Sequence, residues 1–194
     1  MNIKTFDGGL YKGEVVTVPV FIGIDQSYGG FAITALSELS NEYYTWVYKA
    51  EGTGVVRLNN ISIFIEDIFG NFLNIQDIAM EGYAFGSQIA NMLGELGGVV
   101  KLTIYNLLYD GKGRFPVIVP PTTLKKYATG KGQGVSKSQI LLSVYKKWGV
   151  EFTDDNAADS YVLAHLISGR CQTGYEQELY EKVQDPKYRE GQME

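Results

Sequence analysis

Residues 18–36, VPVFIGIDQSYGGFAITAL, decide how the chain begins to fold. The apolar, β-branched run of residues 18–25 predicts a buried strand that ends at Asp25. The turn-forming segment QSYGG (26–30) follows, and residues 31–36 predict a second strand that is antiparallel to the first. A carboxylate at the tip of a buried strand must be solvated, paired or bound to a ligand, so Asp25 needs an explanation.

The remaining sequence predicts strands and helices in alternation. Further strands are expected at 42–50, 75–81 and 115–120, and helices at 57–73, from Ser87 to about Tyr109, near Thr122, at 136–149 and at 153–169. This order indicates an α/β fold in which helices flank a five-stranded mixed sheet. We expect one domain over residues 1–170, with an N-terminal extension at 1–17, and a polar tail at 171–194 that is either helical or frayed.

The composition is that of a globular protein, and its single cysteine is compatible with a reducing compartment without requiring one. The 194 residues are 45% apolar and 20% charged, and they suffice for a sizeable core. The single cysteine, Cys171, excludes a disulfide framework and a cysteine-based zinc cluster. The N-terminal residues lack the pattern of a signal peptide, and no segment approaches the roughly 20 apolar residues of a membrane span. We therefore expect a cytoplasmic protein without a membrane partner.

The net charge of −5 conceals an uneven distribution of basic residues. Residues 111–150 hold 8 of the 17 basic residues and none of the 22 acidic ones, namely Lys112, Arg114, Lys125, Lys126, Lys131, Lys137, Lys146 and Lys147. A solvated helix face usually interleaves both signs of charge. The segment therefore favours a surface that binds a polyanion such as nucleic acid.

Three glycines interrupt the helix that is predicted to begin near Ser87. Gly94, Gly97 and Gly98 each weaken a helix by roughly 1 kcal/mol relative to alanine. Glycine on a helix face allows another backbone to approach closely. These residues therefore indicate a packing contact or a dimer contact.

Three acidic residues lie at the ends of predicted strands or near the start of a predicted helix. Asp25 ends the first strand, Glu81 ends the fourth, and Asp159 lies in the first turns of the last core helix. If the first and fourth strands are parallel neighbours, their ends meet at the edge of the sheet where ligands bind. A helix over that edge would add Asp159, with Asn156 or Asp155 one turn earlier.

Carboxylates gathered in this way repel one another and raise one another's pKa values, unless a divalent cation binds them. Oxygen ligands select Mg²⁺ or Mn²⁺ over zinc, and two such ions about 3.5–4 Å apart can cleave phosphodiesters. Each residue alone has an ordinary explanation: Asp25 could cap a turn, Glu81 could pair with a lysine, and DDNAAD (154–159) could be an acidic helix start. Together, beside the acid-free basic segment, they favour a metal site.

Four segments resemble, in order and spacing, the RuvC-type Holliday junction resolvases of the RNase H-like nuclease superfamily. They are FIGIDQSYGGFAIT (21–34), IAMEGYAF (78–85), VPPTTLKKYATGKGQGVSKSQI (119–140) and DNAADSYVLAHL (155–166). The resemblance covers residues 18–168 and is closer to phage-encoded members than to the bacterial enzyme. It implies an RNase H-like fold and, for a phage protein, the cytoplasm of the host.

The resemblance also implies the metal ligands. Asp25, Glu81 and Asp159 match three of the family's catalytic acids. Asn156 falls where the family usually has Asp and sometimes His, so it offers a carbonyl oxygen but no charge. Asp155, one residue earlier, is the rival fourth ligand.

Contacts with DNA are implied at two sets of residues. Lys137 matches a family lysine near the active centre and Lys125 one that contacts DNA, while Lys126 and Lys131 would hold the flanking backbone. The family carries an aromatic residue after the glutamate that stacks at the opened centre of the junction. Its spacing falls on Ala84, so the stacking residue is either Tyr83 or Phe85.

The function that the resemblance implies is that of a homodimeric endonuclease. It would hold two Mg²⁺ ions per site, with Mn²⁺ as a substitute, and use no small-molecule cofactor. It would resolve four-way and related branched DNA by paired nicks that leave 5′-phosphate and 3′-hydroxyl ends.

Two alternatives stay open. Asn156 argues for a junction-binding protein that does not cleave DNA. GIDQSYGG (23–30) is also similar to the phosphate loop of actin-like and sugar-kinase-like ATPases, but that fold needs a second domain. The only histidine, His165, lies six residues beyond Asp159 and off its face, so we expect it in the core.

Overall fold

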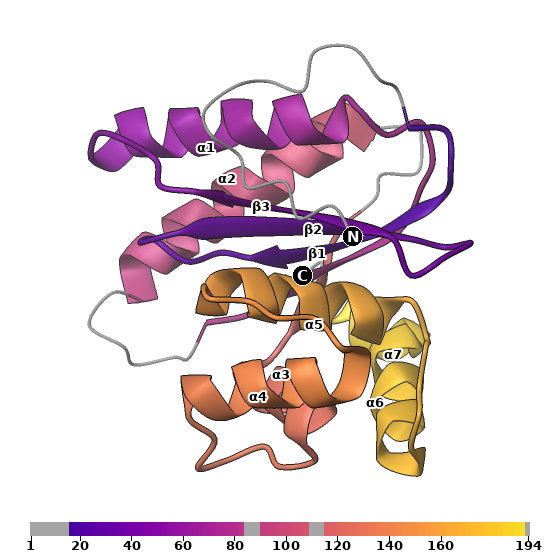
Figure 1. The fold of residues 1–194 in the computed structure, drawn as a ribbon. Coiled ribbons are helices and arrows are strands. Elements are labelled where there is room, and N and C mark those ends of the chain that lie inside the picture. Colours follow the sequence, from indigo (N-terminus) through magenta and orange to yellow (C-terminus); the bar gives the residue numbers. More distant parts are fainter. Residues whose placement is uncertain (1–15, 84–89, 109–114, 193–194) are drawn as a thin grey trace.

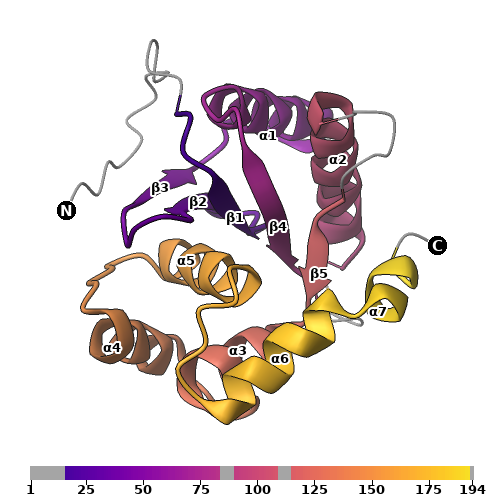
Figure 2. The same ribbon diagram turned by 90° about the vertical axis from the view of Figure 1, so that its right-hand side faces the viewer.

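The computed structural model describes residues 16–83, 90–108 and 115–192. They form the predicted α/β fold, with a five-stranded sheet in the order β3-β2-β1-β4-β5 and helices on both of its faces (Figures 1 and 2). The strands are β1 (Val20–Asp25), β2 (Phe31–Ser37), β3 (Tyr43–Tyr48), β4 (Ile75–Glu81) and β5 (Val117–Val119). Four of them lie within or at the bounds expected from the sequence, and β2 extends one residue further, to Ser37.

The pairing of the strands determines which residues share an edge of the sheet. β1 pairs antiparallel with β2 and parallel with β4, and β4 continues in parallel to β5. In the parallel pair Ile24 lies opposite Met80, so the two chains leave the sheet at the same level. Asp25 and Glu81, the next residue on each strand, therefore emerge side by side.

Helices cover the two faces of the sheet differently. α1 (Gly54–Phe69) and α2 (Ala90–Leu108) lie together on one face, whereas α5 (Asp155–Ile167) packs on the other against β1, β2 and β4 (Figure 1). Beyond α5 lie α3 (Pro121–Thr129), α4 (Lys137–Trp148) and α6 (Gly174–Gln184). Every helix in the described part of the chain is too short or too polar to cross a membrane.

Local sequence signals set the ends of the helices that carry site residues. Ser136 and Gln139 form a capping box at the start of α4, and Gly149 ends that helix in the left-handed conformation with φ 69°, as predicted. The carboxylate of Asp154 caps α5 by accepting a hydrogen bond of 3.1 Å from the amide of Ala157. Ser87, the predicted start of α2, lies outside the described residues.

Buried hydroxyl groups fasten α5 to the sheet. The hydroxyl of Thr34 on β2 lies 2.8 Å from that of Ser160 on α5 and 2.8 Å from that of Thr45 on β3. All three side chains are buried. A satisfied polar contact inside an apolar core fixes one relative position of helix and sheet, because any shift would leave buried groups unpaired.

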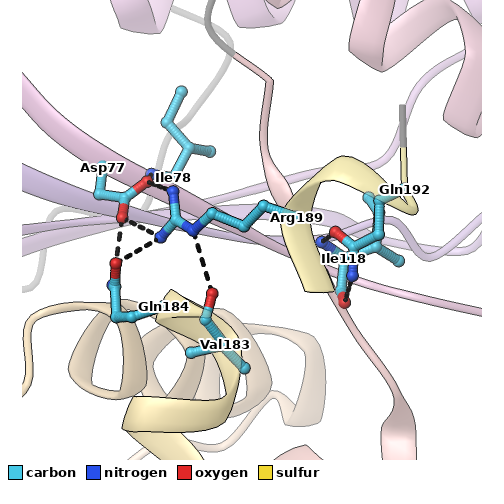
Figure 3. A network of polar contacts seen from close by, with 7 residues as sticks. All are labelled: Asp77, Ile78, Ile118, Val183, Gln184, Arg189 and Gln192. Carbon is cyan, nitrogen blue, oxygen red and sulfur yellow. Dashed lines mark hydrogen bonds and ion pairs between the residues drawn. The ribbon is translucent and has the colours of Figure 1, made fainter. Parts of the chain in front are cut away.

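The C-terminal residues, expected to be helical or frayed, form α6 and α7 (Pro186–Glu190). Figure 3 shows how they hold the edge of the sheet: Arg189 pairs with Asp77 at 2.5 Å. Gln192 accepts a hydrogen bond from the amide of Ile118 at 2.8 Å and donates one to its carbonyl at 2.9 Å. The open edge of β5 is thereby covered, which prevents pairing with another strand.

Gly23 on β1 is the point of closest approach between α5 and the sheet. A Cβ atom there would overlap the carbonyl oxygen of Ser160 and lie 2.5 Å from the amide nitrogen of Ala164. We predict that Gly23→Ala lowers the free energy of unfolding by about 3 kcal/mol or more, since overpacking against rigid backbone cannot relax. Urea denaturation measures this change.

Gly29→Ala is the matched control, because the structure places no atom of the described residues within 4 Å of a Cβ at that position. It is expected to change stability little. Equal stability of the two variants would contradict the tight contact between β1 and α5.

Candidate active site

Three carboxylates meet at the edge of the sheet where β1 and β4 end. Asp25 comes from β1, Glu81 from β4 and Asp159 from the second turn of α5. Each offers one oxygen atom, and these oxygens all lie within 4.8 Å of one another. The structure thus brings together the three acids that the sequence singled out.

The ionised form of each of the three carboxyl groups is destabilised in this position. Burial, followed by the charges of Glu81 and Asp159, raises the pKa of Asp25 well above its usual value. Burial, with Glu81 and Asp155, raises the pKa of Asp159 to about 8. Burial also raises the pKa of Glu81. Protons or cations must therefore accompany this group at neutral pH.

A divalent cation fits this group of side chains. Oδ1 of Asp159 is buried and has no hydrogen-bond partner among the described residues. The ligand atoms are hard oxygens, and the part of the chain that the structure describes gathers no histidine or cysteine with them. Such a set suits Mg²⁺ or Mn²⁺, which would replace the missing partner and remove the mutual repulsion.

The acids lie in a cleft of about 380 Å³. Five other predicted site residues line it: Tyr83, Lys125, Lys137, Asp155 and Asn156. Lys126 and Lys131 are not part of this lining. Phe85, the second candidate for stacking, lies outside the described residues. The two lysines in the cleft place positive charge beside the acids, and both act to lower the pKa of Asp159.

The two rivals for the fourth ligand have different neighbours. Asp155 forms an ion pair with Lys137, and that hydrogen bond is the main reason why the pKa of Lys137 is raised. Asn156 faces the turn between β1 and β2: a Cβ on Gly30 would lie 2.8 Å from its Nδ2. Both residues therefore lie at the cleft, but Asp155 already forms an ion pair with the side chain of Lys137.

One of the basic residues is not available to a polyanion. The ammonium group of Lys147 lies 2.8 Å from the carboxylate of Glu176, and its side chain is only 10% exposed. It also lies 4.4 Å from the ring centres of Tyr127 and Trp148. Lys147 therefore joins α4 to α6, and including it in a binding surface was wrong.

His165 packs in the core, as expected. It is 3% exposed and lies between the rings of Trp148 and Tyr161, with ring centres 4.5 Å away in both cases. Burial, with the charges of Arg170 and Lys147, lowers its pKa to about 3. It is thus neutral at physiological pH, and it lies in the last turn of α5, whereas Asp159 lies near the start of that helix.

The glycines of α2 have separate surroundings. A Cβ on Gly94 would lie 3.4 Å from the hydroxyl of Tyr83, and one on Gly97 would lie 3.0 Å from Oε1 of Gln26. Among the described residues, none comes within 4 Å of a Cβ on Gly98. The first two glycines therefore pack against the loops that follow Glu81 and Asp25. Gly98 is exposed to solvent.

Sequence reasoning missed several residues of the cleft. Gln26 and Tyr28 line it directly after Asp25. Arg57 of α1 lies 5.2 Å from the centre of the Tyr28 ring and donates a hydrogen bond of 3.3 Å to the carbonyl of Tyr28. The position of QSY immediately after the acid was the available signal, but the segment was interpreted as a turn and as a similarity to the phosphate loop of ATPases.

Comparison with known proteins supports the fold. No known family profile matches the chain, and no curated protein sequence matches it. Among solved structures, Thermus thermophilus RuvC in complex with a Holliday junction superimposes with a TM-score of 0.61 at 18% identity, covering 75% of this chain and 90% of that one. Thermus thermophilus RuvC also matches in a structure of its own, with a TM-score of 0.60 at 17% identity and coverage of 84% and 96%.

The yeast mitochondrial Holliday junction resolvase Ydc2 gives a TM-score of 0.52 at 18% identity, covering 87% of this chain and 82% of that chain. At these identities, the TM-scores establish a shared fold and nothing beyond it. The acidic cluster lies at the end of the first and fourth strands of that fold. The chain therefore has the RNase H-like fold of the RuvC and Ydc2 resolvases, with a partly buried acidic triad at the edge of its sheet.

The raised pKa of Asp159 makes the stability of the metal-free protein depend on pH. The pKa of Asp159 in the folded state is about 8 and exceeds the ordinary aspartate pKa of 3.8, so the folded state holds this proton more tightly than the unfolded state. Its stabilising effect is complete below pH 3.8 and is lost as pH rises to about 8. In EDTA, the melting temperature of the wild type should therefore fall relative to that of Asp159→Asn between pH 5 and 8.

Mg²⁺ should remove this fall, since a cation favours the ionised carboxylate. Thermal melts at several pH values, with Mg²⁺ or EDTA, provide the measurement. Parallel profiles for wild type and Asp159→Asn in EDTA would show that Asp159 ionises normally.

Proposed function

We propose that this protein is a metal-dependent endonuclease that cleaves four-way and related branched DNA. The observation that carries the proposal is the acidic triad, three carboxylates within 4.8 Å in a cleft that also holds Lys125 and Lys137. An acidic centre that binds cations, with basic side chains beside it, suits a phosphodiester as substrate. The solved complex of RuvC with a Holliday junction, which shares this fold, supports the choice of branched DNA.

The proposed roles follow from the positions of the side chains. Asp25, Glu81 and Asp159 would hold two Mg²⁺ ions, or Mn²⁺ in their place. Bound there, the ions would supply an activated water and neutralise charge at the scissile phosphate. The side chain of Lys137 is 76% exposed at the mouth of the cleft and would approach that phosphate. The products would carry 5′-phosphate and 3′-hydroxyl ends.

Contacts with the rest of the DNA would come from the neighbouring surface. Lys125 lines the cleft, and Lys126 and Lys131 belong to α3 and the loop after it, so they would bind the flanking phosphates by releasing counterions. Tyr83 lines the cleft next to Glu81 and would stack on a base at the opened junction, a role for which Phe85 is the alternative.

A homodimer would suit a four-way junction, whose strands must be nicked as a symmetric pair. Gly98 on the exposed side of α2 offers a place where two backbones could approach closely. Gly94 and Gly97 are less suitable, because Tyr83 and Gln26 already occupy the space beside them.

A junction-binding protein that does not cleave DNA is the second candidate. Asn156 favours it, because an uncharged side chain at the fourth position weakens the hold on a cation. The described residues form a single five-stranded sheet, so the second domain of an actin-like ATPase is not found among them.

The central test is the cleavage of labelled DNA by the wild type, Asp25→Asn and Glu81→Gln. The wild type should nick a four-way junction in Mg²⁺ but not in EDTA. Each variant should lose cleavage by at least about 10³-fold, because a metal ligand is lost, and should bind the junction with unchanged affinity. Fork, duplex and single-stranded DNA define the range of substrates.

A wild type that shifts the junction in a gel but never nicks it would favour the non-cleaving alternative. A variant that cleaves at the wild-type rate would contradict the assignment of the acids.

The fourth ligand can be identified with Asn156→Ala and Asp155→Ala. If Asn156 supplies an oxygen, its removal should raise the Mg²⁺ concentration needed for half-maximal cleavage by about 10-fold. Asp155→Ala should instead release Lys137 from its ion pair and alter cleavage much less. Mg²⁺ titrations of junction cleavage measure both effects, and the reverse order would transfer the ligand role to Asp155.

A further inference from the structure

Gln26 is the first residue after β1, directly following Asp25. The parallel pairing of β1 with β4 ends at Ile24 and Met80. The side chain of Gln26 nevertheless reaches back, and its Nε2 donates a hydrogen bond of 2.7 Å to the carbonyl oxygen of Glu81. The side-chain amide thus supplies a hydrogen bond to the backbone of Glu81, just beyond the last backbone pair of β1 and β4.

The other end of the same amide is unsatisfied. Gln26 is 5% exposed, and its Oε1 is buried without a hydrogen-bond partner among the described residues. A buried acceptor without a partner is destabilising, and a methionine of similar size would avoid this penalty. Packing alone therefore does not explain a glutamine at this position.

The space for Oε1 is provided by α2. A Cβ on Gly97 would lie 3.0 Å from this oxygen, closer than side chains normally approach. Gln26 also borders two cavities, the acidic cleft and an adjoining cavity of about 470 Å³ that is lined by Gly94 and Gly97. The side chain is therefore held between α2 and the end of β4.

We propose that Gln26 is a positioning residue for the metal site, which holds the backbone of Glu81 through its amide and is itself held by α2 at Gly97. This inference rests on the proposed function, because it assumes that the acidic triad binds cations. Groups that orient metal ligands from outside the coordination shell commonly control affinity. Gln26 does so by fixing the carbonyl of Glu81 where β1 can no longer pair with it.

The test measures Mn²⁺ binding to the DNA-free protein by electron paramagnetic resonance, together with thermal melts in EDTA. Gln26→Met should weaken Mn²⁺ binding by about 10-fold or more, the range found when such orienting groups are removed. Val183→Ala is the stability control, since it removes a buried side chain from α6, which carries no residue of the acidic cleft. It should lower the melting temperature and leave Mn²⁺ affinity unchanged.

The two glycines of α2 give an independent arm. Gly97→Ala should weaken Mn²⁺ binding in the same direction, through pressure on Oε1, but by less than Gln26→Met. Gly98→Ala has the same effect on helix propensity and meets no neighbour within 4 Å among the described residues, so it should bind like the wild type. In the Gln26→Met background, Gly97→Ala should have no further effect, because the two changes act through one contact.

The outcomes distinguish this inference from the proposed function. A wild type that binds no Mn²⁺ would overturn the metal site itself. A wild type that binds Mn²⁺, with Gln26→Met within twofold of it, would overturn only the role of Gln26. If Gln26→Met does not fold, Gly97→Ala decides: an affinity equal to that of Gly98→Ala overturns the proposal.

Discussion

The backbone of α5 lies directly on β1 because residue 23 has no side chain, and this contact sets the place of Asp159 above the edge of the sheet. A Cβ on Gly23 would overlap the carbonyl oxygen of Ser160, the residue next to Asp159. The buried contact between Thr34 and Ser160 fixes the helix along the strand. With α5 held in this way, its acid reaches the two that end β1 and β4. Had the helix lain further from the sheet, Asp25 and Glu81 would face each other without the third carboxylate.

Bringing the three carboxylates together creates electrostatic repulsion that only a proton or a cation can relieve. The pKa of Asp25 is raised well above its usual value and that of Asp159 to about 8, so without a cation the group would retain a proton at neutral pH. Binding of cations would release those protons and relieve the repulsion, which couples metal affinity to pH. The neighbouring groups are arranged accordingly: Lys137 is held by Asp155, and the backbone of Glu81 by Gln26. Stability would thus be lost locally at the place where a cation would bind.

The sequence predicted those parts of the fold and the site that depend on local pattern. Alternating strands and helices, with a carboxylate at the end of β1 and another at the end of β4, were enough to expect that Asp25 and Glu81 would meet. Contacts between distant residues were not predictable in this way. Lys147 lies in an acid-free segment, yet its partner Glu176 belongs to the C-terminal region. Likewise, Gly97 was expected at a packing or dimer contact, but only the structure identifies Gln26 as the side chain that it accommodates.

The proposed chemistry depends most on whether the carboxylates of Asp25, Glu81 and Asp159 form a cation site. Anomalous diffraction from crystals soaked in Mn²⁺ tests this directly, because it locates the ion independently of any activity. We predict anomalous density between the carboxylates of Asp25, Glu81 and Asp159, with two peaks when branched DNA is bound. Well-ordered carboxylates with no anomalous peak between them, at a pH above 8 and saturating Mn²⁺, would contradict the account.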